Sequence, residues 1–114
     1  MAFVLDQEES YSWPCRFHVP VSGGKHKTMT FDAEFKNMSQ SRLEELMTLQ
    51  SQGKKTDREI ATEMIIGWSG VVDGKGEEIP FTEKSKKKLL DIAGMGSQMV
   101  QIFISSRSKA KAKN

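Results

Sequence analysis

Apolar and polar residues begin to alternate at Arg16, and the alternation continues through two segments. The apolar positions of the first segment are Phe17, Val19 and Val21. Those of the second segment are Met29, Phe31, Ala33 and Phe35. A period of two is typical of a strand with one buried face, and the Ser-Gly-Gly-Lys sequence at 22–25 favours a turn. The pattern predicts a β-hairpin with one apolar side. Because Pro20 cannot donate a hydrogen bond, the first strand is expected either to be an edge strand or to have the Pro20 nitrogen facing outward.

Beyond residue 38 the apolar spacing changes to that of helices. The expected helix starts, in chain order, are Ser39 or Ser41, Thr56, Thr82 and about Ser97. Gly53 is expected to end the first helix. In the second, Ile60, Met64 and Trp68 recur at every fourth position, which predicts a helix that Gly67 and Gly70 end. The predicted fold class is α+β: an N-terminal antiparallel β-hairpin followed by about four short α-helices.

The length and composition fit one small domain. The chain has 114 residues, of which 37% are hydrophobic, enough to form a single core. We expect an irregular N-terminal arm at residues 1–12, the α+β domain at 13–104, and a basic, disordered tail at 105–114. We also expect neither a secretory signal nor a membrane span, because no long apolar run occurs. One cysteine, Cys15, indicates a reducing compartment such as the cytoplasm.

Positive charge is concentrated at the end of the chain. Residues 105–114 carry Arg107, Lys109, Lys111 and Lys113 and no acid, although the whole chain has a net charge of only +2. The remaining body is therefore slightly acidic and is not expected to attract nucleic acid. Two interpretations of the tail remain: a solvated end or a phosphate-binding arm.

The sequence offers little for catalysis or metal binding. A nucleophilic triad needs a base, and the histidines, His18 and His26, lie on a polar strand face and beside a turn. Cys15 and His18 would point to opposite faces of a strand and could not pair. The Asp73-Gly74-Lys75-Gly76 turn lacks the ligands of a calcium loop. We therefore expect a protein that is not an enzyme, with no cofactor and no metal.

Two further patterns admit more than one interpretation. The lysines at 84, 86, 87 and 88 would spread around a helix, either as a solvated face or as a contact patch for an acidic partner. Seven methionines in 114 residues is a high share. They either fill gaps in the core or form an adaptable interaction surface, and the exposure of Met95 and Met99 distinguishes these alternatives.

The segment 65–82, Ile-Ile-Gly-Trp-Ser-Gly-Val-Val-Asp-Gly-Lys-Gly-Glu-Glu-Ile-Pro-Phe-Thr, is more specific. It resembles a signature of the tail assembly chaperones of siphovirus-type phages and prophages. The signature residues are Gly67, Trp68, Asp73, Gly74, Pro80 and Phe81, followed by Leu89-Leu90-Asp91-Ile92. The hairpin and the Leu-Glu-Glu-Leu sequence at 43–46 also resemble this family, and Ala93-Gly94 departs from its more usual Pro-Gly. The resemblance covers roughly residues 13–104.

The resemblance implies a function that no spacing above establishes. Members of this family are non-enzymatic; they bind the tape measure protein, keep it soluble and help to recruit tail tube subunits during tail morphogenesis. They act in the cytoplasm of the bacterial host and are absent from the mature virion. The alternative is a small basic nucleic-acid-binding or adaptor module.

Finally, the sequence suggests surfaces and anchors. We expect Trp68 and Phe81 to belong to the core and to hold the connection between them. The apolar stripe of the last helix is the first candidate for partner binding or for a homo-oligomer interface; it comprises Met95, Met99, Ile102 and Phe103. The free edge of the first strand is a second candidate.

Overall fold

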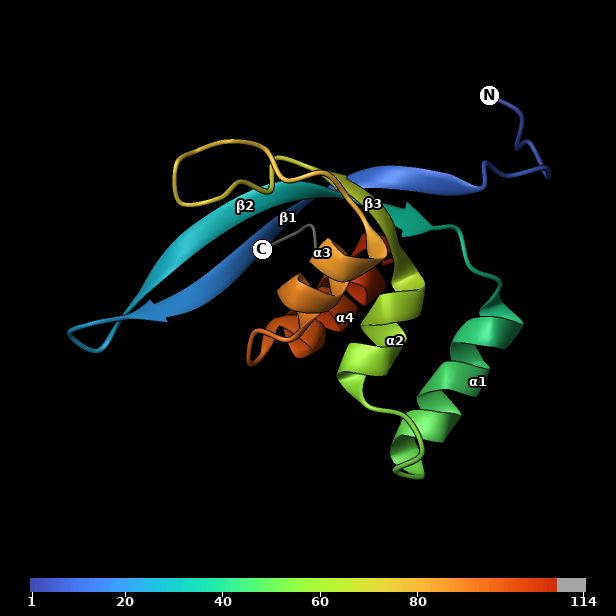
Figure 1. Ribbon diagram of the computed structural model, residues 1–114. Coiled ribbons are helices and arrows are strands. Elements are labelled where there is room, and N and C mark those ends of the chain that lie inside the picture. Colours follow the sequence, from blue (N-terminus) through green and yellow to red (C-terminus); the bar gives the residue numbers. More distant parts are fainter. Residues whose placement is uncertain (109–114) are drawn as a thin grey trace.

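The computed structural model describes residues 1–108, which form a three-stranded antiparallel sheet and four helices (Figure 1). The strands are β1 (Ser10–Val21), β2 (Lys25–Lys36) and β3 (Ile65–Ser69), in the spatial order β1-β2-β3. The helices are α1 (Gln40–Ser51), α2 (Asp57–Met64), α3 (Glu83–Leu90) and α4 (Met95–Ser106). The expected α+β class, a hairpin followed by short helices, is confirmed.

The hairpin is longer than the alternation alone predicted. β1 and β2 pair from Ser10 opposite Lys36 to Val21 opposite Lys25. Gly23 and Gly24 make the turn with φ of +93° and +73°, values that a residue with a Cβ rarely adopts. Because β1 begins at Ser10, the irregular arm comprises residues 1–9 and not 1–12.

The sequence interpretation was wrong about Trp68, which lies on a strand and not on a helix. α2 ends at Met64, and Ile65 already has an extended backbone (φ −96°, ψ 125°). β3 then pairs with β2, with Ala33 opposite Trp68 and Phe35 opposite Ile65. The β-branched pair Ile65-Ile66 suits an extended chain, and the free edge of β2 supplies the hydrogen bonds that a longer helix would have made internally.

The predicted helix starts are largely confirmed. The Ser39 side chain accepts from Arg42 N and caps α1, so the alternative box at Ser41 does not form. Reciprocal capping boxes begin α2 at Thr56 and α3 at Thr82. α4 begins at Met95, two residues earlier than expected, after Gly94 in a left-handed conformation (φ +83°).

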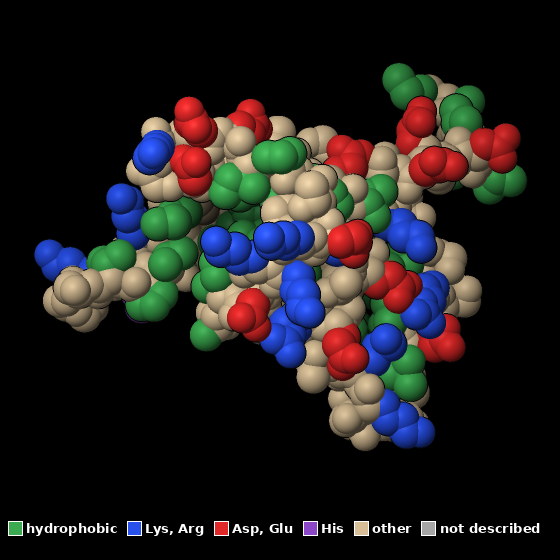
Figure 2. All heavy atoms as spheres, viewed as in Figure 1, with side chains coloured by type: hydrophobic (Ala, Val, Ile, Leu, Met, Phe, Trp, Pro, Cys, Tyr) green, Lys and Arg blue, Asp and Glu red, His purple; other side chains and the backbone are tan. Residues whose placement is uncertain are grey.

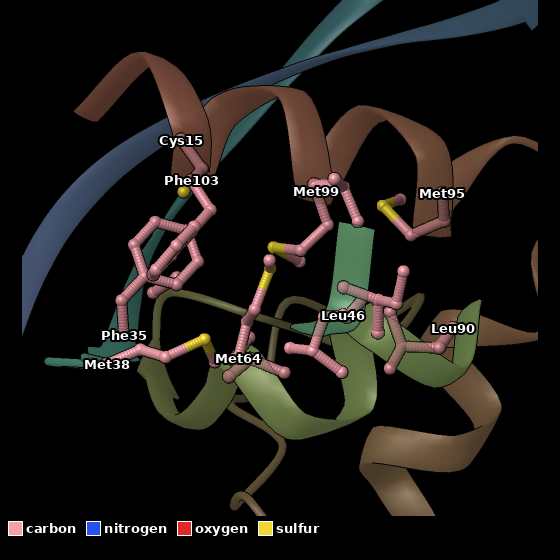
Figure 3. Close-up of a cluster of buried hydrophobic side chains, with 14 of the residues drawn as sticks. Cys15, Phe35, Met38, Leu46, Met64, Leu90, Met95, Met99 and Phe103 are labelled. Carbon is pink, nitrogen blue, oxygen red and sulfur yellow. The ribbon is translucent and has the colours of Figure 1, made fainter. Parts of the chain in front are cut away.

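The core lies between the helix-facing side of the sheet and α2, α3 and α4. Figure 3 shows Phe35 from β2 against Phe103 from α4, with Met64, Met99 and Leu46 filling the space between the helices. The Phe35 and Phe103 rings meet edge to face, with their centroids 5.3 Å apart. Burial of such side chains supplies most of the folding free energy of a small domain.

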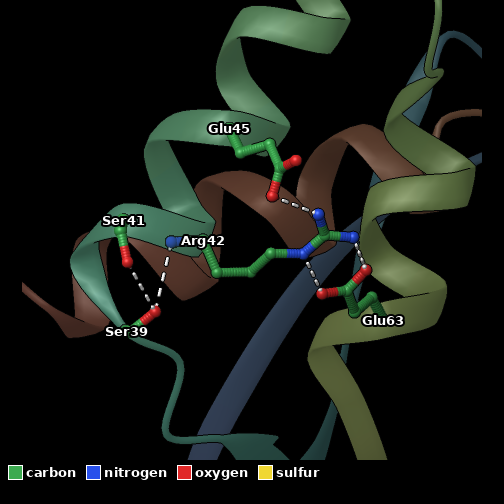
Figure 4. A network of polar contacts seen from close by, with 5 residues as sticks. All are labelled: Ser39, Ser41, Arg42, Glu45 and Glu63. Carbon is green, nitrogen blue, oxygen red and sulfur yellow. Dashed lines mark hydrogen bonds and ion pairs between the residues drawn. The ribbon is translucent and has the colours of Figure 1, made fainter.

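α1 is joined to this core by the fully buried Leu46 and by an ion-pair network (Figure 4). Arg42 Nε and Nη2 each donate to the Glu63 carboxylate over 2.7 Å, which ties α1 to α2. Arg42 Nη1 also donates to Glu45 within α1. Hydrogen bonds from Arg42 lower the pKa of Glu63. A two-pronged contact of this kind fixes the orientation of the helix pair.

The ordered chain extends past the predicted end of the domain at residue 104. α4 continues to Ser106, whose Oγ lies 2.8 Å from the Tyr11 hydroxyl in a hydrogen bond. Arg107 donates to Asn37 and lies over the Tyr11 ring, 5.5 Å from its centroid. The start of the predicted tail therefore packs against β1. The basic residues Lys109, Lys111 and Lys113 lie outside the described residues.

Candidate interaction surface

The connection from Gly67 to Phe81 folds as one packed unit around Trp68. The Trp68 indole Nε1 donates to Ile79 O over 2.8 Å, which closes the connection onto β3. The Trp68 ring meets Phe81 edge to face at 4.9 Å and Phe31 at 6.2 Å. Trp68 and Phe81 are half-buried and pack against the edge of the core, so they hold the connection as expected without being fully enclosed.

Asp73 organises the turn at the far end of this connection. Its Oδ1 accepts from the backbone N of Lys75 (2.8 Å) and of Glu77 (3.0 Å). Gly76 has a φ of +84°, whereas Gly74 and Pro80 are exposed without a comparable constraint. Gly67 lies where β3 passes close to β2, and a Cβ there would meet Glu34 Cβ at 3.1 Å. Four of the six signature residues, Gly67, Trp68, Asp73 and Phe81, thus have a structural reason.

The lysine run does not form a uniform patch. Lys84, Lys87 and Lys88 are exposed, but Lys86 is only 8% exposed. Lys86 Nζ donates to Thr62 O over 3.1 Å and lies 5.6 Å from the centroid of the Phe81 ring. Thr62 O is one of the last carbonyls of α2, which lack partners within the helix, so Lys86 caps the negative end of that helix. The interpretation of Lys86 as a solvated or partner-binding residue is wrong.

The predicted interface on α4 is also wrong. Met99 and Phe103 are 0% and 1% exposed, and Met95 is 6% exposed. Ile102 is half-buried against the same core. Met95, Met99 and Phe103 cover the sheet and α2, so they are not free to meet a partner. The two methionines fill the core.

The candidate nucleophile and base lie apart, as expected. The Cys15 thiol is 1% exposed and burial raises its pKa to about 11, which keeps it protonated and unreactive. His18 is exposed on the opposite strand face, and its backbone N and O both bond to the Gln98 side chain of α4. Within residues 1–108, no group of three His, Cys, Asp or Glu side chains is placed to hold a metal ion.

Exposed apolar side chains gather instead on the outer half of the hairpin. We define the hairpin shelf as Val19, Val21 and Met29, together with Lys25 and Lys27. Register places Lys27 opposite Val19, Lys25 opposite Val21, and Met29 opposite the buried Phe17, so the five side chains share the helix-facing side of the sheet. Met29 is 47% and Val21 43% exposed, whereas Val19 is half-buried; the helices end before the outer part of the hairpin (Figure 1). Figure 2 shows hydrophobic side chains here, next to the blue side chains of the tip.

The sequence analysis did not single out Lys25 and Lys27. The basic character of the hairpin is visible in the sequence, since residues 10–31 contain Arg16, Lys25 and Lys27 and no acid. Strand register was needed to show that two of these three charges share a face with exposed apolar residues.

The N-terminal arm, residues 1–9, is a second exposed apolar element. Phe3, Val4 and Leu5 are 83%, 67% and 85% exposed. Asp6, Glu8 and Glu9 follow them, and the arm contains no Lys or Arg. Asn37 holds its base, with the backbone N donating to Glu9 O and the side-chain Nδ2 donating to Glu8 O.

Comparison with known proteins returns no relative: no protein family matches the chain, and neither a characterised protein nor a solved structure is significantly similar to it. Across residues 1–108, every helix is too short or too polar to cross a membrane.

Proposed function

We propose that this chain is a tail assembly chaperone of a siphovirus-type phage or prophage. It binds the tape measure protein in the bacterial cytoplasm and helps to recruit tail tube subunits, without forming part of the finished virion. The proposal rests on the resemblance of residues 65–82, and one structural observation supports it. Residues that carry the resemblance, above all Trp68, Asp73 and Phe81, lie together in a closed unit at the edge of the core.

Exposed apolar side chains fit a protein that binds other chains. Val72, in the connection, is 52% exposed, and Ile92, after α3, is 50% exposed. Amphipathic helices of a long partner are recognised through such apolar side chains, in shallow contacts repeated along the partner. The connection is the surface we assign to the partner, because it carries both the resemblance and Val72.

Coexpression tests the proposal. The chain is produced together with the long helical tape measure protein encoded in the same phage or prophage genome, and the soluble, copurifying fraction of that protein is measured. We expect the tape measure protein to be soluble with the chain and to aggregate without it. A tape measure protein that neither becomes soluble nor copurifies contradicts the proposal.

Two matched variants locate the contact. Val72→Asp places a charge on the connection, and we expect it to reduce copurification. Ile104→Asp changes a similarly exposed residue (41%) on α4 and is expected to have no effect. If both variants copurify like the wild type, the connection is not the partner surface.

The alternative is a small nucleic-acid-binding module. One observation favours it: the hairpin between Ser10 and Phe31 has three basic residues and no acid. Phosphate binding through these residues would produce a mobility shift with generic DNA that weakens steeply with salt. We expect no such shift, because Asp32 and Glu34 follow directly on β2 and the body as a whole is not basic.

A further inference from the structure

The N-terminal arm and the hairpin shelf carry opposite charges beside exposed apolar side chains. In the arm, Phe3, Val4 and Leu5 precede three acids. In the shelf, Val19, Val21 and Met29 lie among Lys25 and Lys27. Figure 2 shows the contrast: the arm at the upper right has red and green side chains, and the hairpin tip at the left has blue and green ones. The two surfaces are therefore complementary in charge, and both carry apolar side chains.

The arm cannot cover the shelf of its own chain. Asn37 holds the backbone at Glu8, and the stretch from Phe3 to Glu8 spans at most about 18 Å. Along β1, the distance from Ser10 to Val21 is about 36 Å. Figure 1 shows the two surfaces at opposite ends of the molecule. The longest dimension of the molecule is 46 Å.

We propose that the N-terminal arm of one copy docks on the hairpin shelf of the next copy. Phe3 and Leu5 cover Val21 and Met29, while the acids that follow them in the arm meet Lys25 and Lys27. The contact is heterologous, because the two surfaces that meet are different. Every copy in a row therefore retains one free arm and one free shelf, and the contact generates open chains or closed rings of copies.

The charges also disfavour the symmetric alternatives, in which arm meets arm or shelf meets shelf. Two arms that met each other would bring six carboxylates together without a Lys or Arg. Two shelves that met would place four lysines together without an acid. Like charges at a contact weaken it, so the arm-to-shelf pairing is favoured over both.

The proposal is tested on the purified full chain alone, so that its failure is separate from failure to bind a tape measure protein. Light scattering measures the mean mass across a concentration series, at salt of about 0.05 M and about 0.5 M. We expect the mass to rise well above the 12.8 kDa monomer with concentration, and to fall when salt is added. A chain that remains at 12.8 kDa at all concentrations overturns the proposal.

Two variants remove one partner surface each. The arm variant is Phe3→Asp with Leu5→Asp, and the shelf variant is Lys25→Glu with Lys27→Glu. All four residues are exposed, so we expect unchanged circular dichroism and an apparent association at least about tenfold weaker. The control, Lys87→Glu with Lys88→Glu, makes the same charge change on α3 and should assemble like the wild type. Wild-type assembly by either the arm or the shelf variant overturns the proposal.

Mixing the two variants is the decisive step. The arm variant retains an intact shelf and the shelf variant retains an intact arm, so one contact can form between them and growth must then stop. We expect a one-to-one complex with twice the monomer mass and nothing larger. Either no complex or continued growth contradicts an arm-to-shelf contact.

Discussion

Gly96 of α4 lies against the backbone of Arg58 in α2. A Cβ at position 96 would come within 2.8 Å of Arg58 Cα and 2.9 Å of Arg58 N, closer than real atoms pack. The absence of a side chain lets α4 approach the first turn of α2. This approach seats Met99 and Phe103, further along α4, in the core.

Gly96→Ala should therefore destabilise the fold even though alanine favours helices. The added methyl meets main-chain atoms that cannot rotate away, and overpacking of this kind costs about 1–3 kcal/mol. Urea unfolding measures the change. Gly74→Ala is the matched control, since a Cβ there meets nothing within 4 Å, and it should change stability by less than about 0.5 kcal/mol. If the two variants are equally stable, α4 can move away from α2 at no cost, and the close approach at Gly96 does not contribute to stability.

Lys86→Met should destabilise the fold by about 1–2 kcal/mol, because the aliphatic stem is retained but Thr62 O at the end of α2 loses its charged donor. Chemical denaturation of two separate variants, Lys86→Met and the control Lys87→Met, distinguishes the loss of the hydrogen bond from the loss of one positive charge. Lys87 is exposed, so its variant should be nearly neutral. If both variants lose the same stability, the contact with α2 contributes nothing.

Trp68→Phe separates the indole hydrogen bond from the ring packing. Loss of the bond to Ile79 O should cost about 1 kcal/mol, whereas Trp68→Ala also removes the contacts with Phe31 and Phe81 and should cost about 3 kcal/mol. Thermal melting of the three proteins gives the order. A Trp68→Ala protein that melts at the wild-type temperature would show that the connection is not held by this residue.

Stability should fall in alkali through Cys15. Its pKa is raised from 9.0 to about 11 in the folded chain, because burial disfavours the thiolate. The contribution of the neutral thiol is complete below pH 9 and is lost as the pH rises toward 11. We expect the difference in stability between the wild type and Cys15→Ala to shrink over this range. A difference that is constant from pH 8 to pH 11 would show that the thiol does not titrate with unfolding.

Features specified by neighbouring residues could be predicted from the sequence. The hairpin follows from alternation around Gly23-Gly24, and the helix starts at Thr56 and Thr82 follow from side chains that bond three residues ahead. Each depends on a short stretch of chain, so no knowledge of the tertiary structure was needed.

Features that depend on contacts between distant segments could not be predicted from the sequence. Trp68 fits a four-residue helical period, and only the free edge of β2, more than thirty residues earlier, makes its segment a strand. Met99 and Phe103 read as a surplus apolar stripe, because the sequence does not show that Gly96 lets α4 close over Phe35. Nothing in the sequence distinguishes Lys86 from the neighbouring lysines, because its role depends on the contact with Thr62 O, 24 residues earlier.

The hydrogen bond between Tyr11 and Ser106 joins the first strand to the last helix, across 95 positions of sequence. On the ribosome, β1 and β2 are complete long before α4 has been translated. Phe17 and Phe35 then have no cover from that helix, so the nascent hairpin presents an apolar face to solvent until α4 has been made. Contacts between residues so far apart in sequence also slow folding. The newly made chain therefore exposes apolar surface for longer and is more prone to aggregate.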